Sequence, residues 1–293
     1  MRVAFIGIGN MGWPMAANLV KGGHDVIVFD ADGARAARFA QEHGARAART
    51  LADLAASQFV VTMLPDGHAV RKVLTEAEGG GLAKHLAPGT IVIDMSSSDP
   101  VGTRELGPVM AAHGVVLIDA PVSGAVPRAK TATLAIMIGG EDKDAIARAK
   151  PILSCMGDRL FDTGGLGTGH AMKALNNFVA ATGYTAAAEA LLIGKRFGLD
   201  PAAMIDIINA STGRNFITEL VMKEHVLSGK YATGFALGLL AKDVRIAADL
   251  GEAVKLDAPV SRLIRERWAL ARDRLGATRD NSAAILGWED EIL

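Results

Sequence analysis

The chain has 293 residues, half of them hydrophobic, and its 31 basic and 32 acidic side chains leave a formal net charge of −1. This length allows one large or two moderate domains with a sizeable core. The near-neutral charge without a basic tract argues against a nucleic-acid partner, and the lack of a long apolar run argues against a membrane span. A single cysteine, Cys155, leaves no intrachain disulfide framework. Together with an N-terminus that reads as a strand and not as a signal peptide, this predicts a cytoplasmic protein.

The first thirty residues predict a dinucleotide-binding unit. An apolar strand at residues 3–6 runs directly into a G-x-G-x-x-G turn at residues 7–12, which opens a helical pattern at 15–20. A second apolar strand at 26–29 ends at Asp30. A tight turn alone would explain the glycines but not the strand, helix, strand and acid around them. The full order favours a dinucleotide-binding βαβ unit.

Each residue of the turn has a predicted task in binding the pyrophosphate. Gly7 permits the sharp turn, Gly9 lets the backbone approach the phosphates, and Gly12 lets the helix pack on the sheet. Asn10 and Met11 complete the turn at the helix N-terminus, where free N–H groups and the helix dipole attract phosphate.

The acid at the end of the second strand predicts the choice of coenzyme. Asp30 can accept hydrogen bonds from both ribose hydroxyls of the adenosine, and its charge would repel a 2′-phosphate. Ala31 and Asp32 follow it directly, without an arginine. We therefore expect NAD as the cofactor in preference to NADP.

Strand and helix patterns alternate through the first half of the chain. Strand patterns recur at residues 59–64, 90–94, 115–119 and 134–138, with helical patterns at 34–43, 69–74 and 100–113. This alternation predicts an α/β Rossmann domain with a mostly parallel, doubly wound sheet. Ligands of such sheets bind outside the carboxyl ends of the strands, so the turns at 7–12, 64–65, 96 and 121–124 are expected to line one cleft.

Only helical patterns follow in the second half. A glycine-rich stretch at residues 164–169 reads as a hinge, and an alanine- and leucine-rich helix without proline runs from 170 to 197. Shorter helical patterns cover residues 202–210, 218–225, 241–253 and 260–274. We expect a dinucleotide-binding domain at residues 1–163 and an all-α domain at 164–293, joined by the long helix.

A dehydrogenase needs a group that takes the hydroxyl proton, and Lys173 is the best-placed candidate. It lies in the first turns of the long helix, and Asn177 follows four residues later on the same helix face. An ordinary lysine has a pKa near 10.4, so a base at neutral pH requires desolvation or a nearby cation. From spacing alone, a solvated helix lysine is the more common interpretation.

Four separated motifs give the chain a resemblance to a known family. They are the turn at residues 7–12, the segment at 119–124, the segment at 167–177 with Lys173, and the pair Lys242 and Asp243. Over nearly its whole length the chain resembles the β-hydroxyacid dehydrogenases, which include 3-hydroxyisobutyrate dehydrogenases and small semialdehyde reductases.

The resemblance implies a role for each matching position. Lys173 would be the catalytic lysine, and Ser123 and Gly124 would bind the substrate carboxylate. Asn177 would orient the reacting hydroxyl or carbonyl. The remaining positions are implied to contact the cofactor: Leu64, Pro65, Ser96 and Lys242. A homodimer or homotetramer is also implied.

Some positions depart from the family pattern or stay open. Ala125 and Ala132 stand where the family commonly has glycine. Arg214 and Asn215 either reach the substrate or form a turn after a helix, and Trp13 lies either on the helix surface or over the cleft. The histidines are scattered, so we predict no metal.

These observations predict an NAD-dependent dehydrogenase that oxidises a short 3-hydroxy acid, with 3-hydroxyisobutyrate as first choice. An NADPH-dependent reductase of a small semialdehyde is the nearest alternative. Imine reduction is disfavoured by Lys173, and a nucleotide-binding module without catalysis would leave Ser123 and Lys173 unexplained. The identity of the small carboxylate substrate is left open.

Overall fold

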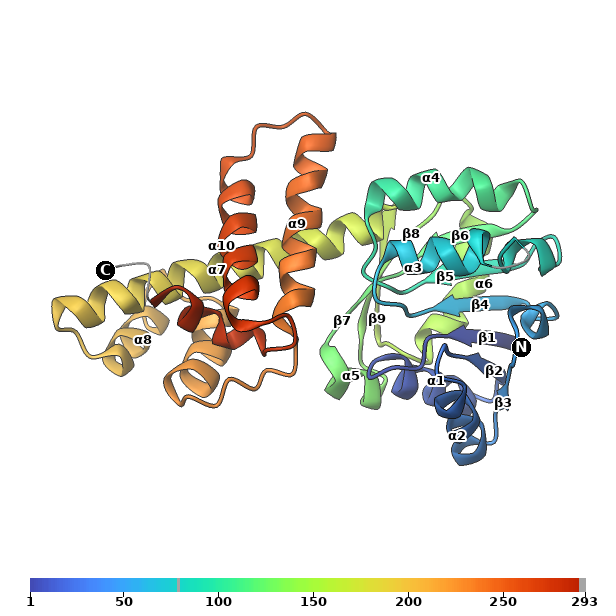
Figure 1. Cartoon of the computed structure of the whole chain (residues 1–293), viewed down its shortest axis with the longest axis horizontal. Helices are drawn as coiled ribbons and strands as arrows, with labels where there is room; N and C mark the ends of the chain where they lie inside the picture. Colours follow the sequence, from blue (N-terminus) through green and yellow to red (C-terminus); the bar gives the residue numbers. More distant parts are fainter. Residues whose placement is uncertain (78–79, 290–293) are drawn as a thin grey trace. The chain divides into compact units, whose positions relative to one another are not determined.

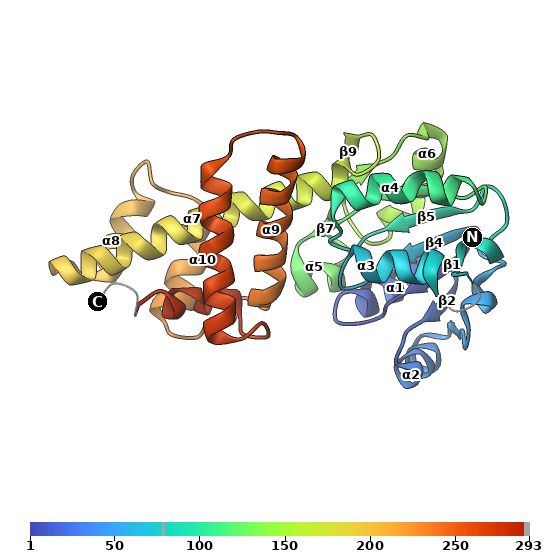
Figure 2. The same ribbon diagram turned by 45° about the horizontal axis from the view of Figure 1, so that its top comes forward.

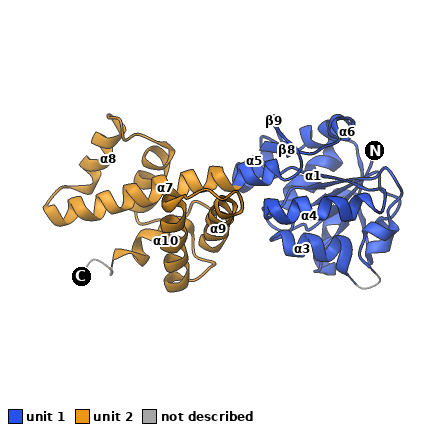
Figure 3. Ribbon diagram, turned by 90° about the horizontal axis from the view of Figure 1, so that it is seen from above, with its two compact units in different colours: residues 1–173 blue, residues 174–293 orange. Residues whose placement is uncertain are grey.

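The computed structural model describes residues 1–77 and 80–289, and the chain forms two compact units, Met1–Lys173 and Ala174–Leu293 (Figure 3). The division falls after Lys173, whereas the sequence suggested a limit after residue 163. The division falls later because the first turn of the long helix α7 (Thr168–Phe197) is hydrogen-bonded to the sheet of the first unit. Each unit is therefore described by itself.

A mostly parallel sheet forms the centre of the first unit (Figure 1). Its strands are β1 (Arg2–Ile6), β2 (Asp25–Phe29), β3 (Arg46–Ala47), β4 (Phe59–Thr62), β5 (Ile91–Asp94), β6 (Val116–Asp119), β7 (Val122–Ser123), β8 (Ala135–Gly139) and β9 (Arg159–Gly164). They are ordered β3-β2-β1-β4-β5-β6-β8-β7, with β9 beside β8. The pairs from β3 to β6 are parallel, while β8 is antiparallel to β6 and β7. The expected doubly wound Rossmann sheet is confirmed.

Helices cover both faces of this sheet. They are α1 (Gly12–Lys21), α2 (Gly33–His43), α3 (Gly67–Arg71), α4 (Pro100–Ala111), α5 (Ala125–Thr131) and α6 (Lys143–Ser154). Short 3₁₀ turns occur at Leu51–Leu54 and Ala83–His85, and a π-helical segment, Lys72–Glu76, continues α3. Several helix starts are capped by a preceding aspartate; Asp99, for example, accepts from the Gly102 N–H at 2.7 Å before α4.

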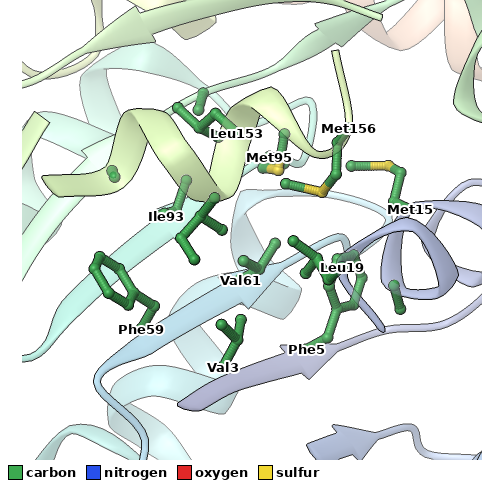
Figure 4. Packing of buried hydrophobic residues seen from close by; sticks show 14 of the residues in the cluster. Val3, Phe5, Met15, Leu19, Phe59, Val61, Ile93, Met95, Leu153 and Met156 are labelled. Carbon is green, nitrogen blue, oxygen red and sulfur yellow. The ribbon is translucent and has the colours of Figure 1, made fainter. Parts of the chain in front are cut away.

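The alternation of side chains along β1 divides the core between the two faces. Val3 and Phe5 join a cluster with α1, α2 and α6 (Figure 4), whereas Ala4 and Ile6 join the cluster under α3 and α4. Because successive residues of a strand point to opposite faces, a strand buried on both sides is apolar throughout. This is why residues 3–6 were recognisable as a strand from sequence.

The last residues of the parallel strands form one row across the sheet. Ile6 is in register with Thr62, Thr62 with Asp94, and Asp94 with Asp119. Asp119 is in turn paired with Gly139 of β8. We call this set the strand-end row; at Thr62, Asp94 and Asp119 it carries polar side chains where the strand interiors carry apolar ones.

The described part of the second unit is helical. It contains most of α7 with α8 (Pro201–Asn209), α9 (Leu237–Ala253), α10 (Pro259–Leu275), a π-helical segment Ile217–Leu227 and a 3₁₀ turn Asn281–Gly287. Helices α9 and α10 lie side by side in both views (Figures 1 and 2). Three buried rings, Tyr184, Trp268 and Trp288, meet edge to face with centroids 5.4–5.9 Å apart and anchor the core.

Some elements were not recognisable from sequence. β3 and β7 have two residues each, and β9 is mostly exposed, so none of them shows a buried apolar run. The helix expected at residues 218–225 is the longer π-helical segment Ile217–Leu227. Cys155 forms the C-cap of α6.

Candidate active site

The glycine turn after β1 is fixed by close backbone packing. Gly7 has a φ of +90°, and a Cβ there would overlap the Met63 carbonyl oxygen. A Cβ on Gly12 would overlap the carbonyl oxygen of Gly7 itself. The Gly7 N–H donates to the Phe29 carbonyl at 2.9 Å, which ties the turn to β2. Gly7 and Gly12 are therefore required by the fold of the turn.

Gly9 differs, because a Cβ there would meet no protein atom within 4 Å. Gly9 and Asn10 are exposed, and the helix behind them, α1, begins after Met11 without a side-chain cap and without an acidic residue in its first turn. Open space in front of an uncapped helix N-terminus suits an anion. The turn therefore fits the pyrophosphate of a dinucleotide.

Asp30 lies where the adenosine ribose of such a cofactor would bind. One carboxylate oxygen accepts from the Ile8 N–H at 2.9 Å, so the acid also supports the glycine turn. The other oxygen accepts from the Asp32 N–H at 2.9 Å and from Arg35 Nη1 at 3.1 Å. Arg35, in the first turn of α2, was not considered from the sequence, although its place five residues after Asp30 was visible there.

The predicted loops after β4 and β5 are joined to each other. Leu64 donates its N–H to the Ser96 hydroxyl at 2.9 Å, and the Ser96 N–H donates to Asp94 at 3.0 Å. Pro65 follows Leu64 directly. The structure thus brings Leu64 and Ser96 together at the strand-end row, while their contact with the cofactor stays a prediction.

The predicted carboxylate-binding segment follows β6. Ser123 ends β7 and is half-buried, and Gly124 precedes α5 with a φ of +136°. A Cβ on Gly124 would lie 2.6 Å from Arg128 Cδ, so this position cannot hold a larger residue without moving Arg128. Ala125 has a φ of +54°, the left-handed region in which glycine is the comfortable residue.

The second departure from the family pattern also lies in the left-handed region. Ala132 has a φ of +57° at the C-terminal end of α5. Ala132→Gly is expected to raise the free energy of unfolding by about 0.5–1 kcal/mol, because left-handed strain costs about 1–2 kcal/mol and the added chain entropy costs less. Urea denaturation measures this. Ala112→Gly is the matched control, since Ala112 caps α4 with a right-handed backbone, and it is expected to destabilise. A lower denaturation midpoint for Ala132→Gly would contradict the strain argument.

The start of α7, which carries Lys173, is anchored on the strand-end row. Both oxygens of Asp119 accept from this turn, one from the Gly167 N–H at 2.7 Å and the other from the His170 N–H at 2.8 Å. A Cβ on Gly169 would overlap the Met137 carbonyl oxygen. The glycines at 167 and 169 therefore serve close packing, and the segment is tied down where a hinge was expected. Lys173 follows on the next turn, half-buried.

Asn177 and Lys242 belong to the second unit, where they share one acid. Asn177 Nδ2 donates to Asp243 Oδ2 at 2.6 Å, and Lys242 Nζ lies 3.6 Å from Asp243 Oδ1. Asn177 and Asp243 are both buried. Asp243 thus fixes the Asn177 amide. In the sequence, Asp243 could be recognised only as part of the pair with Lys242.

Trp13, Arg214 and Asn215, whose roles the sequence left undecided, make structural contacts. The Trp13 ring meets Phe39 edge to face at 5.1 Å and lies 4.6 Å under the Arg38 guanidinium, so it packs α1 against α2. Asn215 Oδ1 accepts from the Ile217 and Thr218 N–H groups, which supports the turn interpretation. Arg214 is paired with Glu219 at 3.4 Å.

The turn after β1, the uncapped α1 and the acid after β2 define a dinucleotide-binding protein of the Rossmann class. Comparison with known families agrees. Residues 2–165 match the NAD-binding domain of 6-phosphogluconate dehydrogenase, and residues 167–287 match the NAD-binding domain of NADP-dependent 3-hydroxyisobutyrate dehydrogenase.

Individual relatives are similar over almost their whole length. The chain is 37% identical to 3-hydroxyisobutyrate dehydrogenase of Pseudomonas aeruginosa, covering 92% of this chain and 91% of that one. It is 34% identical to 2-(hydroxymethyl)glutarate dehydrogenase of Eubacterium barkeri, covering 99% and 95%. The solved Mycobacterium tuberculosis 3-hydroxyisobutyrate dehydrogenase with L-serine superposes with a TM-score of 0.87 at 34% identity, covering 98% of both chains.

The chain belongs to the β-hydroxyacid dehydrogenase family, as the resemblance indicated. It is an oxidoreductase with an NAD-binding domain, of the class that acts on the hydroxyl group of hydroxy acids. The relatives differ in substrate, so membership alone fixes the reaction type and not the substrate.

Two further properties concern the described residues. Within residues 1–77 and 80–289, no three His, Cys, Asp or Glu side chains are grouped so that they could hold a metal ion. None of the helices in this part of the chain combines the length and apolar character that crossing a membrane requires.

Proposed function

We propose that the protein is an NAD-dependent dehydrogenase that oxidises a short 3-hydroxy acid to its semialdehyde, with 3-hydroxyisobutyrate as the first candidate. The observation that carries this proposal is the position of Lys173 on a helix that Asp119 anchors to the carboxyl end of β6. The dinucleotide turn follows the carboxyl end of β1 in the same sheet. A proton-transfer group and a cofactor site are thus built on one edge of the sheet.

The residues divide the chemical tasks among them. A nicotinamide cofactor held by the glycine turn and Asp30 would supply the hydride acceptor for the carbinol carbon. Lys173, as the neutral amine, takes the hydroxyl proton, and in the reverse direction its ammonium returns that proton to the carbonyl oxygen. Ser123 and the backbone at Gly124 bind the carboxylate. Asn177, whose amide Asp243 holds at 2.6 Å, has a second N–H that can donate to the reacting oxygen.

The cofactor assignment uses the residues of the first unit. Gly9 and the N-terminus of α1 would hold the pyrophosphate, and Asp30 would accept from the adenosine ribose. Leu64, Pro65 and Ser96 would support the nicotinamide end, and the family resemblance implies that Lys242 also contacts the cofactor. One observation favours a second candidate, an NADPH-dependent semialdehyde reductase, because Arg35 lies 3.1 Å from Asp30 and could bind a 2′-phosphate.

Steady-state assays of NAD reduction with a panel of substrates test the proposal. The panel contains 3-hydroxyisobutyrate, 2-(hydroxymethyl)glutarate and L-serine, with 3-hydroxyisobutyramide as the matched control. The amide lacks the anion, so kcat/KM is expected to fall at least about 100-fold relative to the acid if Ser123 and Gly124 bind a carboxylate. Absence of turnover with every hydroxy acid of the panel, or equal turnover of acid and amide, would contradict the proposal.

We also propose that the protein forms a homodimer or homotetramer. Within the second unit, α7 exposes two pairs of apolar side chains, Leu175 with Val179 and Ile193 with Phe197, which are 40%, 67%, 65% and 86% exposed. These positions recur on one helix face at about 3.6 residues per turn. Exposed apolar side chains that share one helix face in this way are typical of a protein–protein contact. Sedimentation velocity distinguishes the dimer from the tetramer.

A further inference from the structure

Two buried acids lie side by side in the strand-end row, at the base of α7. Asp94 and Asp119 are neighbours in register on adjacent parallel strands, and both are almost completely buried. Such strands lie about 4.8 Å apart, and like charges directly opposite each other are destabilising. Hydrogen bonds from Thr62 Oγ1 at 2.9 Å and Ser98 Oγ at 2.8 Å support Asp94, but these donors carry no charge.

The side chain that meets both acids is His170. Its Nε2 lies 3.6 Å from Asp94 Oδ2 and its Nδ1 lies 3.8 Å from Asp119 Oδ2. The ring is fully buried and comes from the first turn of α7. His170 therefore connects the two acids of the sheet with the helix that carries Lys173.

The two ring nitrogens of His170 have different surroundings. Nδ1 lies 2.9 Å from the Thr103 hydroxyl, which also contacts the Asp99 carbonyl oxygen at 2.9 Å. The other nitrogen, Nε2, is buried without a hydrogen-bond partner among the described residues and faces Asp94.

We propose that His170 is a positioning residue for Lys173: by bridging Asp94 and Asp119 it fixes the first turn of α7, and with it the direction of the lysine one turn later. Residues three apart on a helix share a face, so a shift of the first turn of α7 at His170 would also shift the Lys173 side chain. The proposal rests on the catalytic role of Lys173 proposed above. It concerns His170, Asp94 and Asp119, which are not expected to touch substrate.

A double-mutant cycle between His170 and Lys173 tests this role. His170→Leu removes both polar contacts and is expected to lower kcat about 30-fold, because small misplacements of a catalytic group cost up to about 100-fold. The KM for NAD is expected to change less than about 2-fold, since the glycine turn and Asp30 are untouched. His170→Gln, whose amide can still donate toward Asp94, is expected to recover kcat to within about 5-fold of wild type. Met172→Ala, an exposed neighbour on the same turn, is the control with unchanged kcat.

The second half of the cycle separates positioning from general damage to the fold. In the Lys173→Ala background, His170→Leu is expected to lower the residual kcat by less than about 3-fold, because nothing is left to position. The same 30-fold loss in that background, or a wild-type kcat for His170→Leu alone, would overturn the proposal. Should His170→Leu fail to fold, Thr103→Val replaces it in the cycle, with a smaller loss that must likewise vanish without Lys173. If Lys173→Ala itself kept full turnover, the proposed function would fail, which is a different outcome.

Discussion

Replacing Lys173 by alanine is expected to lower kcat on the order of 10³-fold while the protein still binds NAD. The size follows from the loss of a positioned proton-transfer group, which contributes about 10²–10⁴-fold. Binding is expected to persist because Asp30 is held by the Ile8 and Asp32 N–H groups, and Gly9 lies in the turn after β1. Steady-state kinetics gives kcat, and titration calorimetry gives the Kd of NAD.

Two further variants show what kind of help the lysine gives. Lys173→Arg keeps a positive charge but cannot release a proton near neutral pH. It is expected to be nearly as inactive as the alanine variant if the lysine transfers a proton, and active if the charge alone binds the substrate. Lys195→Ala is the control, a lysine near the other end of α7 with an exposed partner, Glu289, at 3.3 Å. A kcat within about 10-fold of wild type for Lys173→Ala would refute proton transfer by this residue.

The part of the site that depends on local sequence was predictable. A buried parallel strand is apolar at every position. The turn after β1 needs glycine where a Cβ would overlap a carbonyl oxygen. Residues 3–12 can therefore be recognised from the sequence as a strand followed by a glycine turn. The same holds for Asp30, which closes a strand of this kind. These features depend only on residues that are adjacent in the sequence, so no knowledge of the rest of the fold is needed to find them.

The missing part depends on pairing between distant segments. Asn177 is held by Asp243, 66 residues further along the chain. His170 meets Asp94 and Asp119 only because the register of β5 and β6 places those acids side by side. Periodicity shows that a strand exists but not which residue of its neighbour lies opposite. Arg35 is a different case, because it lies in the first turn of α2, only five residues after Asp30. Its contact with Asp30 could therefore have been predicted from the sequence spacing.

The pairing of Asp30 with Arg35 predicts a strong dependence of coenzyme choice on a single acid. One oxygen of Asp30 holds the guanidinium at 3.1 Å, and the carboxylate side chain is only 9% exposed while Arg35 is 40% exposed. In the proposed NAD complex the acid would accept from the ribose, and it keeps the arginine occupied at 3.1 Å. Without the acid, the guanidinium becomes available for a 2′-phosphate, which it can bind through two N–H groups.

Asp30→Ser is therefore expected to shift the ratio of kcat/KM for NAD over NADP by about 100-fold toward NADP. The estimate assumes that each of two charge-assisted hydrogen-bonding changes contributes about 1.4 kcal/mol, which is tenfold. Kinetics with both coenzymes at saturating hydroxy acid measures the ratio. The serine keeps one acceptor for the ribose, so the loss with NAD is expected to be partial.

A second substitution identifies the part played by the arginine. In the Asp30→Ser, Arg35→Ala double variant, the gain with NADP is expected to disappear while the loss with NAD remains, because the phosphate has lost its cation. Arg35→Ala alone is expected to leave NAD turnover within a few-fold of wild type, since Asp30 keeps its contacts with the Ile8 and Asp32 N–H groups. An unchanged coenzyme ratio in Asp30→Ser would show that selection lies elsewhere. A full gain with NADP in the double variant would show that repulsion by Asp30, and not attraction by Arg35, sets the preference.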